Sequence, residues 1–559
     1  VFRNMKMVTV TCENNNVVKE YPIGTTLAAI ACDLNVKLKS RVIGVYVNNA
    51  IKELSFTPIA ASNVRFFGME TEDGREMYNR TLFFVMFAAI NELFPEYKVT
   101  LEYPVSSGFY CTAKKGNEVF SSSQLEVVIS RMKEIIAADV PINRIELPNE
   151  KAIELFEEQS LTDKTNLLRT RGSFFTSVYY IGQTIDYFYG YLAPTAGCLD
   201  VFDLSIYGDG FILSVPDEDN DCKTVKKFQN EKEIISNYAA HNRWQEAFHL
   251  DTIGDLNEAI ESGRISEIIK VAETNQEVRM HVVAQNIVDR AEKVRVVLLA
   301  GPSSSGKTTS AQRLAIHLQI LGVRCYKLSL DDYFVDREKT PLDENGDYDF
   351  ETIKAVDVDF FNQQINDLLE GKEIEMPRFD FYTGKRSFKG EKLQLKDNDI
   401  VVVEGIHGLN PELIKNIPQE SIYKIFVSAL TTISIDGHNI IPSTDNRLIR
   451  RIVRDQQFRG YRAEDTINRW QKIRAGEKKY IEPYQIHADF VFNSALLYEL
   501  GVLKTYAIPM LERVKETSRA YSEAHRLIKF LSYFENVGVD EIPPTSLVRE
   551  FLGGSSFKY

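Results

Sequence analysis

A glycine-rich segment carries the residue types and spacing that point most directly to chemistry. Residues 301–309 read GPSSSGKTT, after an apolar stretch at 294–300 and before an amphipathic helical pattern that ends at Gly322. Glycines let a backbone fold its N–H groups around phosphate oxygens, and the N-terminus of a following helix adds positive potential. The four fixed positions of such a loop would match by chance roughly 0.02 times in a chain of this length. The segment is therefore predicted to bind phosphate.

Individual positions in this loop have different predicted tasks. Lys307 is placed to reach the β- and γ-phosphates of a nucleotide, and Thr308 is placed to bind Mg²⁺. Lys307 is thus expected to act in catalysis as well as in binding, with ATP and Mg²⁺ as the cofactors. The predicted nucleotide-binding residues of the loop are Gly301, Ser303, Ser304, Ser305, Gly306, Lys307, Thr308 and Thr309.

Acidic residues stand at the ends of two more predicted strands. The strand at 325–330 runs into Asp331 and Asp332. The strand at 399–403, which is apolar enough to lie in the centre of a sheet, runs into Glu404. Open α/β sheets bind their ligands beyond the carboxyl ends of the strands. We therefore expect these carboxylates beside the phosphate loop, at one edge of a mostly parallel sheet.

Four arginines are predicted to line one helical face. Their spacing of i, i+3, i+4 and i+7 places the guanidinium groups on the same side of a helix. Residues 447–479 hold 11 Lys/Arg and 4 Asp/Glu, so this segment carries +7 within a chain of −13. Such a stripe repels itself unless anions or acidic surfaces lie against it, and a solvated basic face is the alternative. The four residues are Arg447, Arg450, Arg451 and Arg454.

Three motifs around these residues resemble those of uridine kinases and phosphoribulokinases. They are SLDDYF at 329–334, VVVEGIH at 401–407 and DNRLIRRIVRDQQFRG at 445–460. The resemblance implies a P-loop kinase domain that uses ATP and Mg²⁺ to phosphorylate a small-molecule hydroxyl, most directly the 5′-hydroxyl of a nucleoside. Catalysis of this kind depends mainly on positioning and on charge stabilisation.

The same resemblance assigns roles to single residues. Asp331 is implied as the general base that faces the acceptor hydroxyl, and it joins Glu404 and Thr308 in the predicted Mg²⁺ shell. Guanidinium groups suit a transferring phosphoryl group because their donors form a rigid fork. The arginines assigned to that group and to closure over ATP are Arg450, Arg454 and Arg459.

The predicted acceptor site departs from the family pattern. Asp349 resembles the aspartate that holds ribose hydroxyls, and MPRFDFYTGKR at 376–386 resembles the base-recognition loop. Phe379 and Gly384 stand where the family has a tyrosine and a histidine that meet a pyrimidine. A site without those hydrogen bonds should discriminate bases poorly or accept another hydroxyl compound, such as a sugar phosphate or a pantothenate-like molecule. The predicted acceptor-binding residues are Asp349, Phe379, Arg386 and Arg447.

The front half of the chain resembles parts of a tRNA-charging enzyme. A ββαβ pattern at 8–47 resembles a ubiquitin-like TGS domain, and segments 73–111 and 187–204 resemble the second, editing-type domain of threonyl-tRNA synthetases. Our alignment places residues that supply neither imidazole nor thiolate at that family's His and Cys positions, which removes the chemistry of deacylation. An RNA- or ribosome-associated regulator that uses ATP as a switch is the alternative function. The substituted positions are Tyr78, Leu82, Phe188 and Leu192.

Together these patterns predict an α/β protein of several parts. A chain of 559 residues is long enough for three or four domains at about 150 residues each. The predicted parts are a TGS-like β-grasp domain at 1–66, a degenerate synthetase-like α+β domain at 67–225, a helical connector at 226–291, a P-loop kinase domain at 292–507 and a helical C-terminal tail at 508–559, irregular after Val537.

The composition excludes several classes of function. With 66 basic and 79 acidic residues, the net charge of −13 disfavours uniform coating of nucleic acid or of anionic membranes. Hydrophobic and charged contents of 44% and 26% are typical of folded proteins. Six scattered cysteines without a CxxC pair fit reduced thiols, and neither a bilayer-spanning run nor a secretory signal is recognisable. We therefore expect a cytoplasmic protein that acts on a small molecule without membrane contact.

Overall fold

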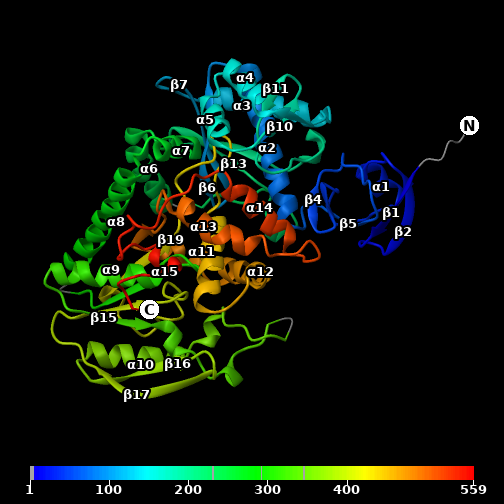
Figure 1. Cartoon of the computed structure of the whole chain (residues 1–559). Coiled ribbons are helices and arrows are strands. Elements are labelled where there is room, and N and C mark those ends of the chain that lie inside the picture. Colours follow the sequence, from blue (N-terminus) through cyan, green and yellow to red (C-terminus); the bar gives the residue numbers. More distant parts are fainter. Residues whose placement is uncertain (1–5, 230–231, 291–292, 344–345, 559) are drawn as a thin grey trace, which may run out of the picture.

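The described part of the chain forms five sheets with helices between and around them. The computed structural model describes residues 6–229, 232–290, 293–343 and 346–558. Figure 1 shows the N-terminal strands on one side of the molecule, apart from the sheet that carries the phosphate loop. The C-terminal helices run back through the middle of the molecule. The predicted α/β fold class is confirmed.

A small mixed sheet opens the chain. Its elements are β1 (Met7–Cys12), β2 (Val17–Pro22), α1 (Leu27–Asp33), β3 (Gly44–Val47), β4 (Ala50–Lys52) and β5 (Ser62–Phe67). The strand order is β2-β1-β5-β3-β4, with β1 and β5 parallel. The hydroxyl of Thr26 caps α1 by accepting a hydrogen bond from the N–H of Ala29. This unit has an apolar core of its own. Its first four elements follow the ββαβ order that the sequence indicated.

The next unit packs two antiparallel sheets against a buried helix. Its elements are α2 (Glu72–Leu93), β6 (Lys98–Val105), β7 (Gly108–Lys115), β8 (Glu118–Val119), α3 (Ser122–Ala137), β9 (Asn143–Pro148), α4 (Asn149–Glu158), α5 (Thr162–Thr170), β10 (Phe175–Ile181), β11 (Thr184–Asp186), β12 (Asp203–Tyr207) and β13 (Gly210–Ser214). The sheet orders are β11-β10-β9 and β12-β13-β7-β6, with β8 beside β7. Every residue from 81 to 90 in α2 is buried, because a helix that is apolar on all sides belongs in a core.

Three helices lead from this unit to the phosphate loop, in the segment expected to be a helical connector. They are α6 (Lys232–Phe248), α7 (Ile253–Glu261) and α8 (Ile265–Val288). Gly263, between α7 and α8, has φ +78°, a left-handed conformation that favours glycine after a helix end. The domain boundary predicted between residues 291 and 292 lies outside the described residues.

A parallel sheet carries the phosphate loop. Its strands are β14 (Val296–Ala300), β15 (Cys325–Ser329), β18 (Ile400–Glu404), β19 (Ile422–Ser428) and β20 (Phe490–Asn493). The order is β15-β18-β14-β19-β20, and every pairing is parallel. All residues of β14 are buried, which explains its nearly continuous apolar sequence. The loop, Asp331 and Glu404 therefore meet at one edge of the sheet.

Helices and one hairpin surround this sheet. They are α9 (Lys307–Ile320), α10 (Val358–Leu369), β16 (Ile374–Asp380), β17 (Lys385–Leu393), α11 (Ser443–Phe458), α12 (Ala463–Tyr480) and α13 (Glu499–Leu511). Strands β16 and β17 pair with each other as an antiparallel hairpin. Helix α11 carries the four-arginine stripe, so the predicted helix is present.

The end of the chain belongs to the core. After α14 (Tyr521–Leu531), a largely irregular stretch leads to the short helix α15 (Arg549–Leu552). Leu547, Val548 and Phe551 are buried in the same apolar cluster as residues of α11, α13 and α14. The predicted tail is thus helical and irregular in turn, and it packs near the phosphate loop. Among the described residues, no helix combines the length and apolarity needed to cross a membrane.

Candidate active site

The phosphate loop has the backbone of an anion-binding nest. Ser304 and Gly306 lie in the left-handed region, at φ +58° and +83°. Alternation of backbone conformation of this kind turns successive N–H groups toward one point. Helix α9 begins directly after Gly306, so the N–H groups of its first turn, which have no acceptor within the helix, face the same region.

Polar groups in the loop lack partners that a phosphate would supply. The buried hydroxyls of Ser304 and Ser305 have no hydrogen-bond partner among the described residues. An unsatisfied buried polar group costs about 1–3 kcal/mol. Within the part of the chain that the structure describes, the Lys307 ammonium donates only to the carbonyl of Pro302, at 3.0 Å, and burial lowers its pKa. The loop therefore fits the phosphate group that its sequence predicted.

Two carboxylates converge on Lys307 from neighbouring strands. Ser329 and Glu404 are paired residues at the ends of β15 and β18, and the Ser329 hydroxyl donates to Oε1 of Glu404 at 3.0 Å. Burial, followed by the charge of Asp331, raises the pKa of Glu404 to about 7. Burial also raises the pKa of Asp331, although the charge of Lys307 opposes that shift. These three predicted residues thus share one electrostatic site.

This donor set suits a hard divalent cation. Within the described ranges, no group of three Asp, Glu, His or Cys side chains is arranged to hold a metal. Mg²⁺ commonly takes only one or two carboxylates and completes its shell with waters and substrate phosphates. Thr308, Asp331 and Glu404, all oxygen donors, fit that role beside a phosphate loop.

Asp332 faces a different direction from Asp331. Its Oδ1 accepts a hydrogen bond from the N–H of Phe379 at 3.1 Å, and its Oδ2 pairs with Nη1 of Arg378 at 3.0 Å. Both partners lie on β16, so Asp332 fixes the hairpin to the site.

Two arginines of the α11 stripe support the phosphate loop from behind. Arg447 forms two hydrogen bonds with Glu477, at 2.6 and 3.0 Å, and donates to the carbonyl of Ser303. Arg450 pairs with Glu499 at 2.6 Å and donates to the carbonyl of Ser304 at 3.3 Å. Both side chains are buried and bound to the protein: Arg447 pairs with Glu477, which the count of four acids already includes, and Arg450 pairs with Glu499, which lies outside that segment.

The other arginines form a basic cluster around one carboxylate. Asp455 lies 3.2 Å from Nε of Arg451, 3.0 Å from Nη2 of Arg454 and 3.6 Å from Nη1 of Arg459. Burial lowers the pKa of Arg451 to about 10, and the charges of Arg454 and Arg459 act in the same direction. Three guanidinium groups around a single carboxylate leave an attractive position for an anion.

Glu351 is a site residue that the sequence reasoning missed. Burial raises its pKa to about 7, and the charges of Glu477, Arg451, Lys307 and Asp331 all act on it. The predicted Asp349 instead accepts a hydrogen bond from the N–H of Glu351 at 3.0 Å and so shapes the turn. The signal available in the sequence was a second acid, Glu351, two residues after the predicted Asp349 in the segment DFE.

The predicted acceptor residues separate into two groups. Phe379 is 9% exposed and lies against the rings of Phe334 and Phe381, with centroids 5.7 and 5.1 Å away. Arg386 pairs with Asp357 at 2.9 Å and lies over the ring of Phe360. Phe379 therefore adds an apolar surface at the hairpin, whereas Arg386 is committed to the protein.

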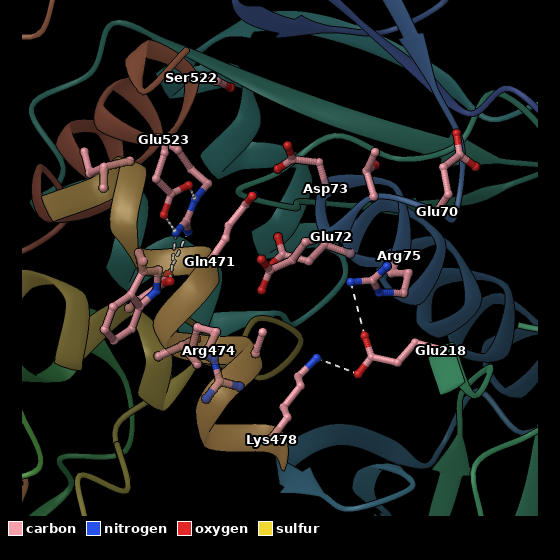
Figure 2. Close-up of a pocket in the computed structure, with 18 of the residues that line it drawn as sticks. Glu70, Glu72, Asp73, Arg75, Glu218, Gln471, Arg474, Lys478, Ser522 and Glu523 are labelled. Atoms are coloured by element: carbon pink, nitrogen blue, oxygen red, sulfur yellow. Dashed lines mark hydrogen bonds and ion pairs between the residues drawn. The ribbon is translucent and has the colours of Figure 1, made fainter. Parts of the chain in front are cut away.

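A hollow of about 1210 Å³ lies between the front half and α12, away from the phosphate loop (Figure 2). Its wall carries many charges of both signs, and several are already paired. Glu218, for example, binds Lys478 at 2.5 Å and Arg75 at 3.2 Å. None of the predicted site residues lines this hollow. We therefore locate the candidate active site at the phosphate loop.

Comparison with known proteins divides the chain. Residues 296–497 match the sequence model of the Phosphoribulokinase / Uridine kinase family. A uridine kinase of Lactobacillus helveticus (strain DPC 4571) is 29% identical over 206 residues, which cover 37% of this chain and 89% of that enzyme. The larger part of the chain thus lies outside this match.

Two further matches are a curated ligase and a solved structure. A threonine–tRNA ligase of Carboxydothermus hydrogenoformans (strain ATCC BAA-161 / DSM 6008 / Z-2901) is 28% identical over 191 residues, which cover 34% of this chain and 30% of the ligase. A solved structure described as that of a possible uridine kinase from Bacillus stearothermophilus is 21% identical, with a TM-score of 0.24, and the match covers 37% of this chain and all of that one (100%).

Proposed function

We propose that this chain, in which residues 296–497 form a P-loop kinase domain of the phosphoribulokinase and uridine kinase type, transfers a phosphoryl group from ATP to a small-molecule hydroxyl. The observation that carries the proposal is the convergence of Lys307, Asp331 and Glu404 beside the phosphate loop. This arrangement holds phosphate-binding and hydroxyl-activating groups at the edge of one rigid sheet.

Each group has a role in the proposed reaction. The loop and Lys307 hold the nucleotide phosphates, and Asp331 accepts the proton of the acceptor hydroxyl. Arg454 and Arg459 stabilise the negative charge of the transferring group. Thr308, Asp331 and Glu404 would hold Mg²⁺, which would supply charge neutralisation at the phosphate oxygens.

A nucleoside is the proposed acceptor. Support comes from the relatives that are named uridine kinases and from the apolar ring of Phe379, whose backbone N–H donates to Asp332. We propose weak discrimination between bases, because Phe379 and Gly384 offer no side-chain hydrogen bond to a base.

The front half supports a second candidate function. We propose the division into parts at 1–66, 67–225, 226–291, 292–507 and 508–559, and we regard the second part as non-catalytic. The similarity of the chain to a threonine–tRNA ligase over 191 residues favours an RNA-contacting regulator in which ATP acts as the switch. The four residues at the substituted editing positions are all buried, at 0–2% exposure: Tyr78, Leu82, Phe188 and Leu192.

An acceptor screen with two variants tests the proposed function. The full chain is given MgATP and a panel of nucleosides, sugar phosphates and pantothenate, with and without RNA. We expect ATP consumption with at least one nucleoside, and Lys307→Ala should lower it by at least about a hundredfold. Lys354→Ala, an exposed lysine of the same half, is the matched control and should keep full activity.

The outcomes separate the candidates. ATP consumption only with RNA would favour the regulator, and consumption only with a non-nucleoside would keep the kinase but change its acceptor. Near-normal activity of Lys307→Ala would remove the phosphate loop from the reaction.

A further inference from the structure

The C-terminal segment, residues 546–558, lies directly on the phosphate loop and on the first turns of α9. Oε2 of Glu550 accepts hydrogen bonds from the N–H of Thr309, at 3.1 Å, and from its hydroxyl, at 2.6 Å. The side chain of Leu547 fills the space beside Gly306, where an added Cβ would lie 2.7 Å from Leu547 Cδ2. Figure 1 shows α15 next to the start of α9.

Glu550 binds the N–H and the hydroxyl of Thr309, and donors at this position bind phosphate in loops of the GxxxxGK(S/T) type. Thr309 is the third residue of α9, and N–H groups in the first turn of a helix have no acceptor within the helix. These N–H groups cradle the phosphates of a nucleotide in loops of this sequence. A carboxylate is an anionic oxygen acceptor like a phosphate. Glu550 and a nucleotide phosphate therefore compete for the same donors.

The backbone of this C-terminal segment is firmly anchored, so the part that can move away from Thr309 is the side chain of Glu550. Leu547, Val548 and Phe551 are fully buried. Nη2 of Arg549 donates to the carbonyls of Val539 and Ile542, both at 2.8 Å. By contrast, Glu550 is only partly buried, and the two hydrogen bonds given above join its carboxylate to Thr309 alone among the described residues. A rotation of its side chain would release the N–H and hydroxyl of Thr309 from Glu550 without unfolding α15.

We propose that Glu550 is a built-in competitor of the nucleotide, whose carboxylate occupies a phosphate subsite at Thr309 until ATP displaces it. The proposal rests on the proposed function, because it requires that the loop bind ATP. Its consequence is that the chain binds ATP more weakly than the loop alone would allow. In general, an affinity falls in proportion to the fraction of molecules that is open.

The isosteric variant Glu550→Gln tests this inference through two measurements. ATP binding should become tighter, whereas the ligand-free protein should become less stable. We expect the Kd of MgATP, measured by calorimetry on the full chain, to fall about tenfold, as for an open fraction of about 10% in the parent. The thermal midpoint of the ligand-free variant should fall on the order of 2 °C, because a native contact is weakened. Glu541→Gln, an exposed carboxylate of the same region, should change neither quantity.

A contact with a merely structural role would weaken both stability and ATP binding when it is removed. Unchanged or weaker ATP binding in Glu550→Gln, with binding still abolished by Lys307→Ala, would overturn this inference and leave the proposed function standing. Absence of Lys307-dependent ATP binding in every variant would overturn both. Tighter binding that is lost again in the double variant Lys307→Ala/Glu550→Gln supports both.

Discussion

At the scale of single residues, two adjacent aspartates have separate surroundings. Asp331 shares its electrostatic site with Lys307 and Glu404, whereas Asp332 is bound to Arg378 and to the N–H of Phe379. Both aspartates lie in a short 3₁₀ turn, Leu330–Tyr333, directly after β15, and with three residues per turn successive side chains point about 120° apart, which accounts for the difference. The proposed general base is therefore Asp331, and Asp332 positions the hairpin.

Substitution of each aspartate by asparagine should separate these roles. Asp331→Asn should lower kcat by about a hundredfold to ten-thousandfold, with little change in the Kd for ATP, because positioned proton transfer is lost. Asp332→Asn weakens the contact with Arg378, so it should mainly raise KM for the acceptor. Steady-state kinetics with the acceptor found in the screen measures both. If Asp332→Asn had the larger effect on kcat, the role of base would pass to Asp332.

At the scale of elements, α12 connects the phosphate loop to the rest of the molecule. Glu477 on this helix accepts hydrogen bonds from the N–H of Ser303 at 2.9 Å, from Arg447 and from Arg474. Burial alone would raise the pKa of Glu477, but the charges of Arg447 and Arg474 lower it. Other residues of α12, including Arg474 and Lys478, line the hollow in Figure 2. The helix thus contacts the loop on one side and the front half on another.

Removal of the charge of Glu477 should destabilise this arrangement. Glu477→Gln leaves Arg447 without its buried counter-charge, and breaking a buried pair typically costs 3–5 kcal/mol, so we expect a loss of about that size in the free energy of unfolding. Chemical denaturation measures it. Lys472→Ala is the control on the same helix, because Lys472 is about half exposed (48%) in its pair with Asp343 and should cost less than about 1 kcal/mol. Equal effects of the two variants would contradict the role given to Glu477.

At the scale of the whole molecule, a buried ionic network joins the front half to the kinase part. Lys164 of α5 lies 2.8 Å from Asp186 of β11 and 3.0 Å from Asp436, in the loop after β19. His438, from the same loop, lies 2.7 Å from Asp186 and 3.2 Å from the carbonyl of Val99. Lys164, Asp186 and Asp436 are all completely buried. Two parts that share such a network are expected to unfold together.

Removal of the lysine should uncouple the two parts. Lys164→Met leaves two buried carboxylates without their cation, which should lower the free energy of unfolding by about 3–5 kcal/mol. Calorimetry should then show the front half and the kinase part melting separately. Lys19→Met, in an exposed pair with Asp33, should leave the melting profile almost unchanged. A single unshifted transition in Lys164→Met would show that the network does not couple the parts.

The sequence by itself determined the features that depend on neighbouring residues. The phosphate loop, β14 before it and α9 after it follow from one short motif and its flanking periodicity. Glu404 lies at the end of β18 and Asp331 in the short turn after β15, near the edge expected from the sequence, because a parallel sheet brings the carboxyl ends of its strands together. The arginine stripe of α11 is also predicted as helical from the sequence, because the 3.6-residue period of a helix depends only on residues close together in the chain.

Only the tertiary structure decided what faces these residues. The carboxylates that hold Arg447, Arg450 and Thr309 are Glu477, Glu499 and Glu550, which lie 30, 49 and 241 residues away along the chain. Each stands in a segment whose pattern gives no sign of its partner. A charge on a helix face looks unpaired in the sequence until folding brings an acid against it, because electrostatic contacts depend on distance in space rather than along the chain.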